Sequence, residues 1–111
     1  MDRFLVLYRS PTPAAEMMAS VTPQQAEAGM AEWTAWADTN HDAIVDLGVP
    51  LGSGRHLDGG SAAAGSSDAT GYSILQADSL DAATKILEDH PHFRTPGGTI
   101  DVLEFLQMPG M

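Results

Sequence analysis

The chain has 111 residues, 43% of them hydrophobic and 18% charged, and this length allows one domain with a modest core. Fifteen acidic residues against five lysines and arginines give a net charge of −10, which argues against nucleic acid or an anionic membrane as a partner. The absence of cysteine excludes disulfides, thiolate metal sites and cysteine nucleophiles. The apolar run at residues 4–8 is too short for a signal peptide or a membrane span, so we expect a soluble cytoplasmic protein.

The first half of the chain predicts a strand followed by a helix. Residues 3–9 are a continuous apolar run rich in β-forming side chains, which predicts a strand buried on both faces. Residues 10–20 contain two prolines and predict a connection with room for a helical turn near Glu16. Thr22-Pro23-Gln25 is typical of a capped helix start, and we expect the helix to run to about Asn40. One helical stripe is predicted to face the core: Ala26, Met30, Trp33 and Ala37.

The second half predicts a glycine-rich region and then a strand, a helix and a strand. Within residues 47–71 we expect a short strand at 53–58, a turn at Asp58-Gly59 and a loop over 60–69. Residues 72–77 predict a third strand. Asp78 or Ser79 then caps a helix that Pro91 ends, and residues 100–108 predict the last strand. The order β-α-β-β-α-β indicates a ferredoxin-like α+β sandwich with both helices on one face of the sheet.

Three of the predicted strands carry large apolar side chains on both faces. Within the first strand, Phe4, Val6 and Tyr8 oppose Leu5 and Leu7. Within the third, Tyr72 and Ile74 oppose Leu75 and Ala77, and within the last, Ile100, Val102 and Leu106 oppose Leu103 and Phe105. Two helices can cover only one face, and the other would expose a larger apolar patch than soluble monomers tolerate. We therefore expect a homodimer that packs sheet against sheet. The alternative is that loop 59–71 or connection 10–20 folds over the second face.

A series of motifs along nearly the whole chain resembles the YCII-related family. They are Tyr8, the Thr22-Pro23 helix with Trp33 and Trp36, Gly48–Gly52, Gly71–Asp81, Asp89–Phe93 and Gly97–Val102. The resemblance implies a dimeric α+β barrel, and it leaves the activity open, because most members have none established and a few resemble lyases acting on halogenated aromatics. An acid–base pair proposed for the better-known branch is not matched here, because its positions fall near Met30 or Ala31 and near Asn40. Asp38 would correspond to the aspartate of that pair only if the alignment with the family were shifted, and nothing in the sequence justifies such a shift.

His90-Pro91-His92 is the strongest candidate for chemistry, with Asp89 directly before it. Two imidazoles held by a proline just past a helix are suited to proton transfer, and Asp89 is a candidate ligand contact. The alternative is that both histidines cap the carbonyls at the helix end. The two imidazoles and the Asp89 carboxylate are also a possible zinc or iron ligand set, but no metal or cofactor is predicted.

Three further side chains are candidate ligand contacts: Trp36, Arg55 and Tyr72. Trp36 would stack on a ligand or simply pack in the core. Arg55 would bind a ligand carboxylate or pair with an acidic side chain on the surface. Tyr72 would orient an acid or phenol. These candidates favour a small dimeric protein with an organic ligand between sheet and helices. The alternatives are a lyase or isomerase that uses His90 or His92, and a non-catalytic module that binds another protein.

Overall fold

The computed structural model describes residues 1–65 and 68–110, with the backbone alone at 62–65. A four-stranded antiparallel sheet in the order β2-β5-β1-β6 is its main element. These strands are β1 (Asp2–Arg9), β2 (Ile44–Asp46), β5 (Ala69–Ala77) and β6 (Thr99–Glu104). The helices are α1 (Ala14–Ser20), α2 (Pro23–Thr39) and α3 (Leu80–Leu87), with short 3-10 turns η1 (His41–Ala43) and η2 (Pro91–Arg94). The fold is therefore of the α+β class. No helix among the described residues is long and apolar enough to cross a membrane.

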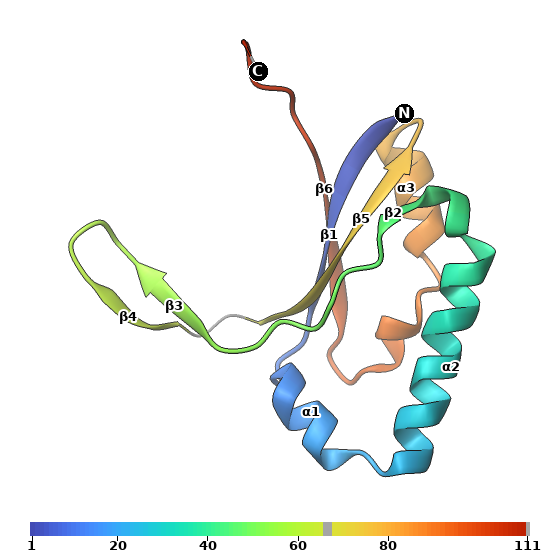
Figure 1. The fold of residues 1–111 in the computed structure, drawn as a ribbon, viewed down its shortest axis with the longest axis vertical. Helices are drawn as coiled ribbons and strands as arrows, with labels where there is room; N and C mark the ends of the chain where they lie inside the picture. Colours follow the sequence, from blue (N-terminus) through green and yellow to red (C-terminus); the bar gives the residue numbers. More distant parts are fainter. Residues whose placement is uncertain (66–67, 111) are drawn as a thin grey trace.

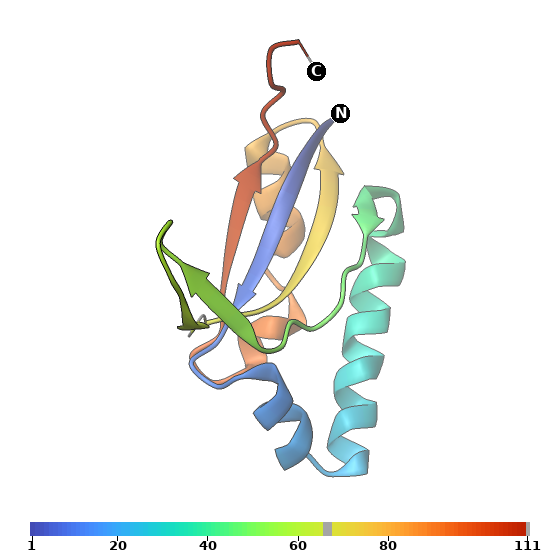
Figure 2. The same cartoon turned by 60° about the vertical axis from the view of Figure 1, so that its left-hand side comes forward.

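Helices α2 and α3 lie on the same face of the sheet, as predicted (Figures 1 and 2). The strand residues that face them form the core: Phe4, Val6, Tyr8, Ser73, Leu75 and Ala77 are all buried. Alternation along each strand sends Leu5, Leu7, Tyr72 and Ile74 to the opposite face, where no described helix or strand covers them. The two-faced strands expected from the sequence are therefore present.

Both core helices begin at the capping residues that the sequence predicts. The Thr22 hydroxyl accepts from the Gln25 backbone N–H at 3.1 Å, and the Gln25 side chain accepts from the Thr22 N–H at 2.9 Å. Ser79 caps α3 by accepting from the Ala82 N–H. Helix α2 ends at Thr39, one residue before the predicted end, and α3 ends at Leu87, three residues before His90. Each cap satisfies a backbone donor that would otherwise lack a partner.

The glycine-rich region differs from its prediction. The predicted strand at 53–58 exists as β3 (Gly54–Leu57), but it pairs with β4 (Ala62–Gly65) in a separate hairpin rather than in the main sheet. The second strand of the sheet is instead β2, which is only three residues long and was not predicted as a strand. The predicted loop at 60–69 is wrong in its first half, because β4 lies there. The last strand ends at Glu104 rather than 108, and α1 replaces part of the predicted connection.

The predicted core stripe of α2 is correct only in its second half. Trp33 and Ala37 pack against the core, whereas Ala26 is exposed and Met30 is 68% exposed. The first turns of α2 extend past the end of the sheet, beside α1, so these apolar residues have no sheet to face (Figure 1). Helical spacing identifies a common face, but the length of the opposing sheet decides how much of it is buried.

Gly48 is required where the chain leaves β2. Its φ is +80°, and a Cβ atom there would lie 1.7 Å from the carbonyl oxygen of Tyr72. We expect Gly48→Ala to lower the free energy of unfolding by about 3 kcal/mol or more, because backbone strain and a clash with β5 add together. Gly59 has a similar φ of +94° but nothing within 4 Å of its Cβ position, so Gly59→Ala should cost about 1 kcal/mol. Urea denaturation measures both, and equal losses would contradict the steric part.

Candidate functional site

The candidate site is a buried aromatic–histidine cluster between the sheet and α2, formed by Tyr8, Trp33, Trp36, His90 and His92. The His90 ring centroid lies 4.5 Å from that of Trp33, 4.3 Å from that of Trp36 and 4.9 Å from that of Tyr8. Both indoles meet the imidazole edge-on, and the His92 ring lies 5.3 Å from Tyr8. The chain has only two tryptophans, and both belong to this cluster.

Local backbone structure carries the two histidines into the cluster. After α3 ends, the His90 N–H donates to the Leu87 carbonyl oxygen at 3.2 Å. Pro91 then begins η2, and the His90 side chain caps this turn. Since proline fixes its own φ and restricts the residue before it, both imidazoles turn inward rather than toward solvent. His90 is 1% exposed and His92 6%.

The hydrogen bonds of His90 define its tautomer. Its Nδ1 accepts from the His92 backbone N–H at 2.9 Å, so in the neutral ring the proton is on Nε2. Nε2 is buried and has no hydrogen-bond partner among the described residues. Burial and the neighbouring His92 lower the pKa of His90 to about 4. At neutral pH His90 is therefore an uncharged donor enclosed by aromatic rings.

His92 has the complementary arrangement. Its Nε2 lies 2.8 Å from the Arg9 carbonyl oxygen, which can only accept, so Nε2 carries the proton. The Nδ1 atom of a neutral His92 then retains a lone pair, and it forms no hydrogen bond with a described residue. In a proton-transfer reaction, His92 is thus the better placed acceptor and His90 the better placed donor.

Tyr8 adds a polar group that the sequence analysis did not select. Its hydroxyl lies 2.8 Å from the Ser73 hydroxyl, which in turn donates to the Leu47 carbonyl oxygen at 2.6 Å. Because Ser73 uses its proton on Leu47, Tyr8 donates to Ser73. Burial raises the pKa of Tyr8 to about 12, so it remains a neutral phenol. A tyrosine at an inward position of a core strand is the signal that could have identified it, because its hydroxyl needs a partner there.

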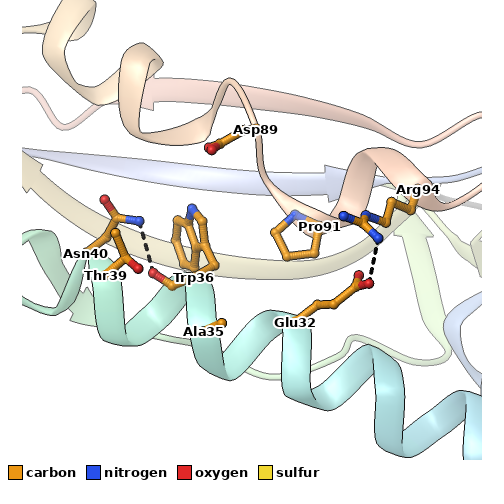
Figure 3. A pocket seen from close by; sticks show the side chains of 8 residues that line it. All are labelled: Glu32, Ala35, Trp36, Thr39, Asn40, Asp89, Pro91 and Arg94. Carbon is orange, nitrogen blue, oxygen red and sulfur yellow. Dashed lines mark hydrogen bonds and ion pairs between the residues drawn. The ribbon is translucent and has the colours of Figure 1, made fainter.

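A surface groove of about 280 Å³ reaches Trp36 from the solvent, between α2 and η2 (Figure 3). Asp89 and Pro91 line it on one side and Asn40 on the other. At one end Arg94 pairs with Glu32 at 2.6 Å. The Trp36 indole N–H donates to the Ile86 carbonyl oxygen at 3.1 Å, which fixes the ring between the groove and His90.

The structure brings four of the six predicted site residues together and separates two. Trp36, Asp89, His90 and His92 lie around the cluster and its groove. Arg55 lies on β3, where its guanidinium donates to the neighbouring Gly54 carbonyl. Tyr72 lies on the uncovered face of the sheet, with its hydroxyl 3.3 Å from Asp46. Asp38 is exposed on α2, with its carbonyl oxygen 3.0 Å from Nδ1 of His41.

Within the described ranges 1–65 and 68–110, no group of three or more histidine and acidic side chains is arranged to hold a metal ion. The two cluster histidines also use one ring nitrogen each on the backbone.

Comparison with known proteins adds evidence on the fold. No family model matches the chain, and no curated protein sequence matches it. Among solved structures it is similar to the 5-chloro-2-hydroxyhydroquinone dehydrochlorinase TftG of Burkholderia phenoliruptrix AC1100, in complex with 2,5-dihydroxybenzoquinone. The TM-score is 0.52 at 17% sequence identity, with 97% of this chain and 96% of that chain covered. This likeness shows a shared fold over the whole length.

The burial of neutral His90 predicts a loss of stability in acid. His90 takes up a proton below about pH 6.5 in the unfolded chain but only below about pH 4 in the folded chain. The free energy of unfolding therefore falls as the pH decreases from 6.5 to 4. Over this interval of about 2.5 pH units, the free energy of unfolding should fall by about 3 kcal/mol. His90→Asn retains an acceptor for the His92 N–H but does not titrate. Denaturation at pH 7 and pH 4 should show that the wild type loses more unfolding free energy in acid than His90→Asn does. Equal losses in the two proteins would contradict the assignment of His90 as a buried neutral imidazole.

Proposed function

We propose that this protein is a homodimer of the ferredoxin-like, dimeric α+β barrel type that binds a planar organic ligand at the aromatic–histidine cluster. The strand order supports this architecture: β5 lies between β2 and β1, and β1 between β5 and β6, which is the split β-α-β arrangement. The fold shared with TftG supports it as well. The residue motifs that resemble the YCII-related family point to the same class.

The observation that carries the ligand proposal is the unpartnered Nε2–H of His90. A buried donor without an acceptor costs about 1 to 3 kcal/mol, so a fold that keeps one gains stability when a ligand supplies the missing oxygen. The surrounding rings of Tyr8, Trp33 and Trp36 favour a flat, partly apolar molecule. The expected ligand is thus an aromatic or quinonoid compound with a carbonyl or phenolate oxygen.

Access to His90 requires one indole to move. Trp36 is held by its hydrogen bond to Ile86, whereas the indole N–H of Trp33 has no hydrogen bond to a described residue. Trp33 is also less deeply buried than Trp36. Rotation of Trp33 would open a space bounded by Tyr8, Trp36 and His90, and the ligand would take the place of the displaced ring.

The second candidate function is catalysis of the lyase or isomerase type at the same site. The specific support is the pairing of a donor, His90 Nε2–H, with a free lone pair on His92 Nδ1. Such a pair would hold a carbonyl oxygen and accept a proton from a neighbouring carbon. TftG is named as a dehydrochlorinase, so chloride release from a chlorinated hydroquinone is the assay to use. Turnover that His92→Phe abolishes, while ligand binding persists, would establish this function over simple binding.

The dimer is tested on the uncovered face of the sheet. Leu103 on β6 is 49% exposed, and Leu103→Asp should convert the dimer to a monomer, because it would bury a charge between two sheets. Leu80 on α3 is 46% exposed but lies on the helix side, so Leu80→Asp should leave the dimer intact. Sedimentation at micromolar concentration measures both variants. A monomeric wild type, or equal behaviour of the two variants, contradicts the proposed interface.

Ligand binding is tested with 2,5-dihydroxybenzoquinone as the probe, measured by calorimetry and by quenching of the two cluster tryptophans. His90→Asn should weaken binding about tenfold, the value of one lost hydrogen bond. His41 is exposed on η1, so His41→Asn is a matched control that should bind like the wild type. Absence of binding to the wild type would contradict the quinonoid ligand class, and equal affinities of His90→Asn and the wild type would contradict the role of His90.

A further inference from the structure

The hairpin of β3 and β4, residues 54–65, stands apart from the rest of the molecule. Its strands pair with each other and with no strand of the main sheet. It projects to the side of the sheet opposite α2 and α3 (Figures 1 and 2). A hollow of about 860 Å³ lies between its base and the start of α1, with Pro13 and Arg55 among the lining residues. A two-stranded hairpin is at best marginally stable in water without a surface to pack on.

The side chains of β3 indicate that a contact is missing. All four residues of this strand are exposed, and Leu57 is 70% exposed. Arg55 forms no ion pair with a described residue, although the chain has fifteen acidic residues and only five lysines and arginines. An unburied leucine and an unpaired cation on a projecting hairpin together favour an acidic partner with an apolar surface.

The area of the sheet leads to the same conclusion. Four strands spaced about 4.8 Å apart, the longest with nine residues, give a flat face of at most about 600 Å². A stable interface takes about 800 Å² of accessible surface from each partner. In a dimer built on this face, the remaining interface area must come from another part of the chain that contacts the second copy. The hairpin projects on that side of the sheet.

We propose that the β3–β4 hairpin is an arm that packs against the second copy of this chain, buries Leu57 there and places Arg55 beside its acidic surface. The inference rests on the proposed homodimer. Packed sheets lie about 10 Å apart, whereas a strand of four residues spans about 13 Å, so the arm is long enough to reach past the interface onto the flank of the second copy. By two-fold symmetry each subunit would both extend an arm and receive one.

The absence of cysteine allows a direct test, because any introduced cysteine is the only one to be labelled. Leu57→Cys, carrying a solvent-sensitive fluorophore, should show blue-shifted emission when the protein is dimeric and red-shifted emission after dilution to the monomer. Met30 on α2 is 68% exposed and matches Leu57 in exposure, so labelled Met30→Cys should show no such shift. Emission from position 57 that stays constant across the dimer–monomer transition overturns the arm.

A second variant tests the same contact without a label. Leu57→Ser should raise the dimer dissociation constant about tenfold, and Met30→Ser should leave it unchanged. Arg55→Glu should weaken the dimer most at low salt, because the repulsion it introduces is screened as ionic strength rises. If the wild type dimerises and these substitutions have no effect, the arm is wrong while the proposed dimer stands. If the wild type is monomeric at every accessible concentration, the proposed dimer and the arm both fail.

Discussion

The alternation of apolar side chains on both faces of β1 and β5 is the constraint on which this structure depends. Helices α2 and α3 lie on one face and bury Val6, Tyr8 and Leu75. The opposite face carries Leu5, Leu7 and Ile74 and is bordered by parts of the chain that project outward. The radius of gyration is 15.6 Å, compared with about 13 Å for a compact domain of this length. In the proposed dimer, the uncovered face and the projecting parts of the chain would pack against the second copy.

The chemistry of the cluster depends on a backbone hydrogen bond rather than on any charged neighbour. Because the His92 N–H occupies His90 Nδ1, the proton of His90 must be on the nitrogen that faces the rings. Burial then keeps this imidazole neutral. A neutral donor suits a ligand oxygen, and it costs the fold less than an enclosed imidazolium would. The proline between the two histidines is therefore important for the tautomer as well as for the turn.

Features encoded over short stretches were predictable from the sequence. Thr22-Pro23-Gln25 specifies the start of α2 by itself. Pro91 sets only an outer limit for α3, which ends four residues earlier, at Leu87. Strand β2 was missed because three residues are too few for a periodic pattern; its pairing with β5 defines it. Met30 was misplaced because helical spacing contains no information on where the sheet ends. The nearness of the two histidines follows from the sequence His90-Pro91-His92 itself, but the roles of Tyr8 and Ser73 depend on a contact between residues 65 positions apart.

The two proposed surfaces lie on opposite sides of the same pair of strands, and this links the dimer to the site. Leu7 and Tyr72 are register partners that face outward, and the next residues along each strand, Tyr8 and Ser73, face inward and share a hydrogen bond. Any second copy that packs on the outer pair restrains the backbone that holds the inner pair. The Tyr8 ring in turn contacts both histidines and Trp33. A dimer contact on one face would therefore limit the motion of the rings that must open for a ligand on the other, so ligand affinity should depend on protein concentration near the dissociation constant of the dimer.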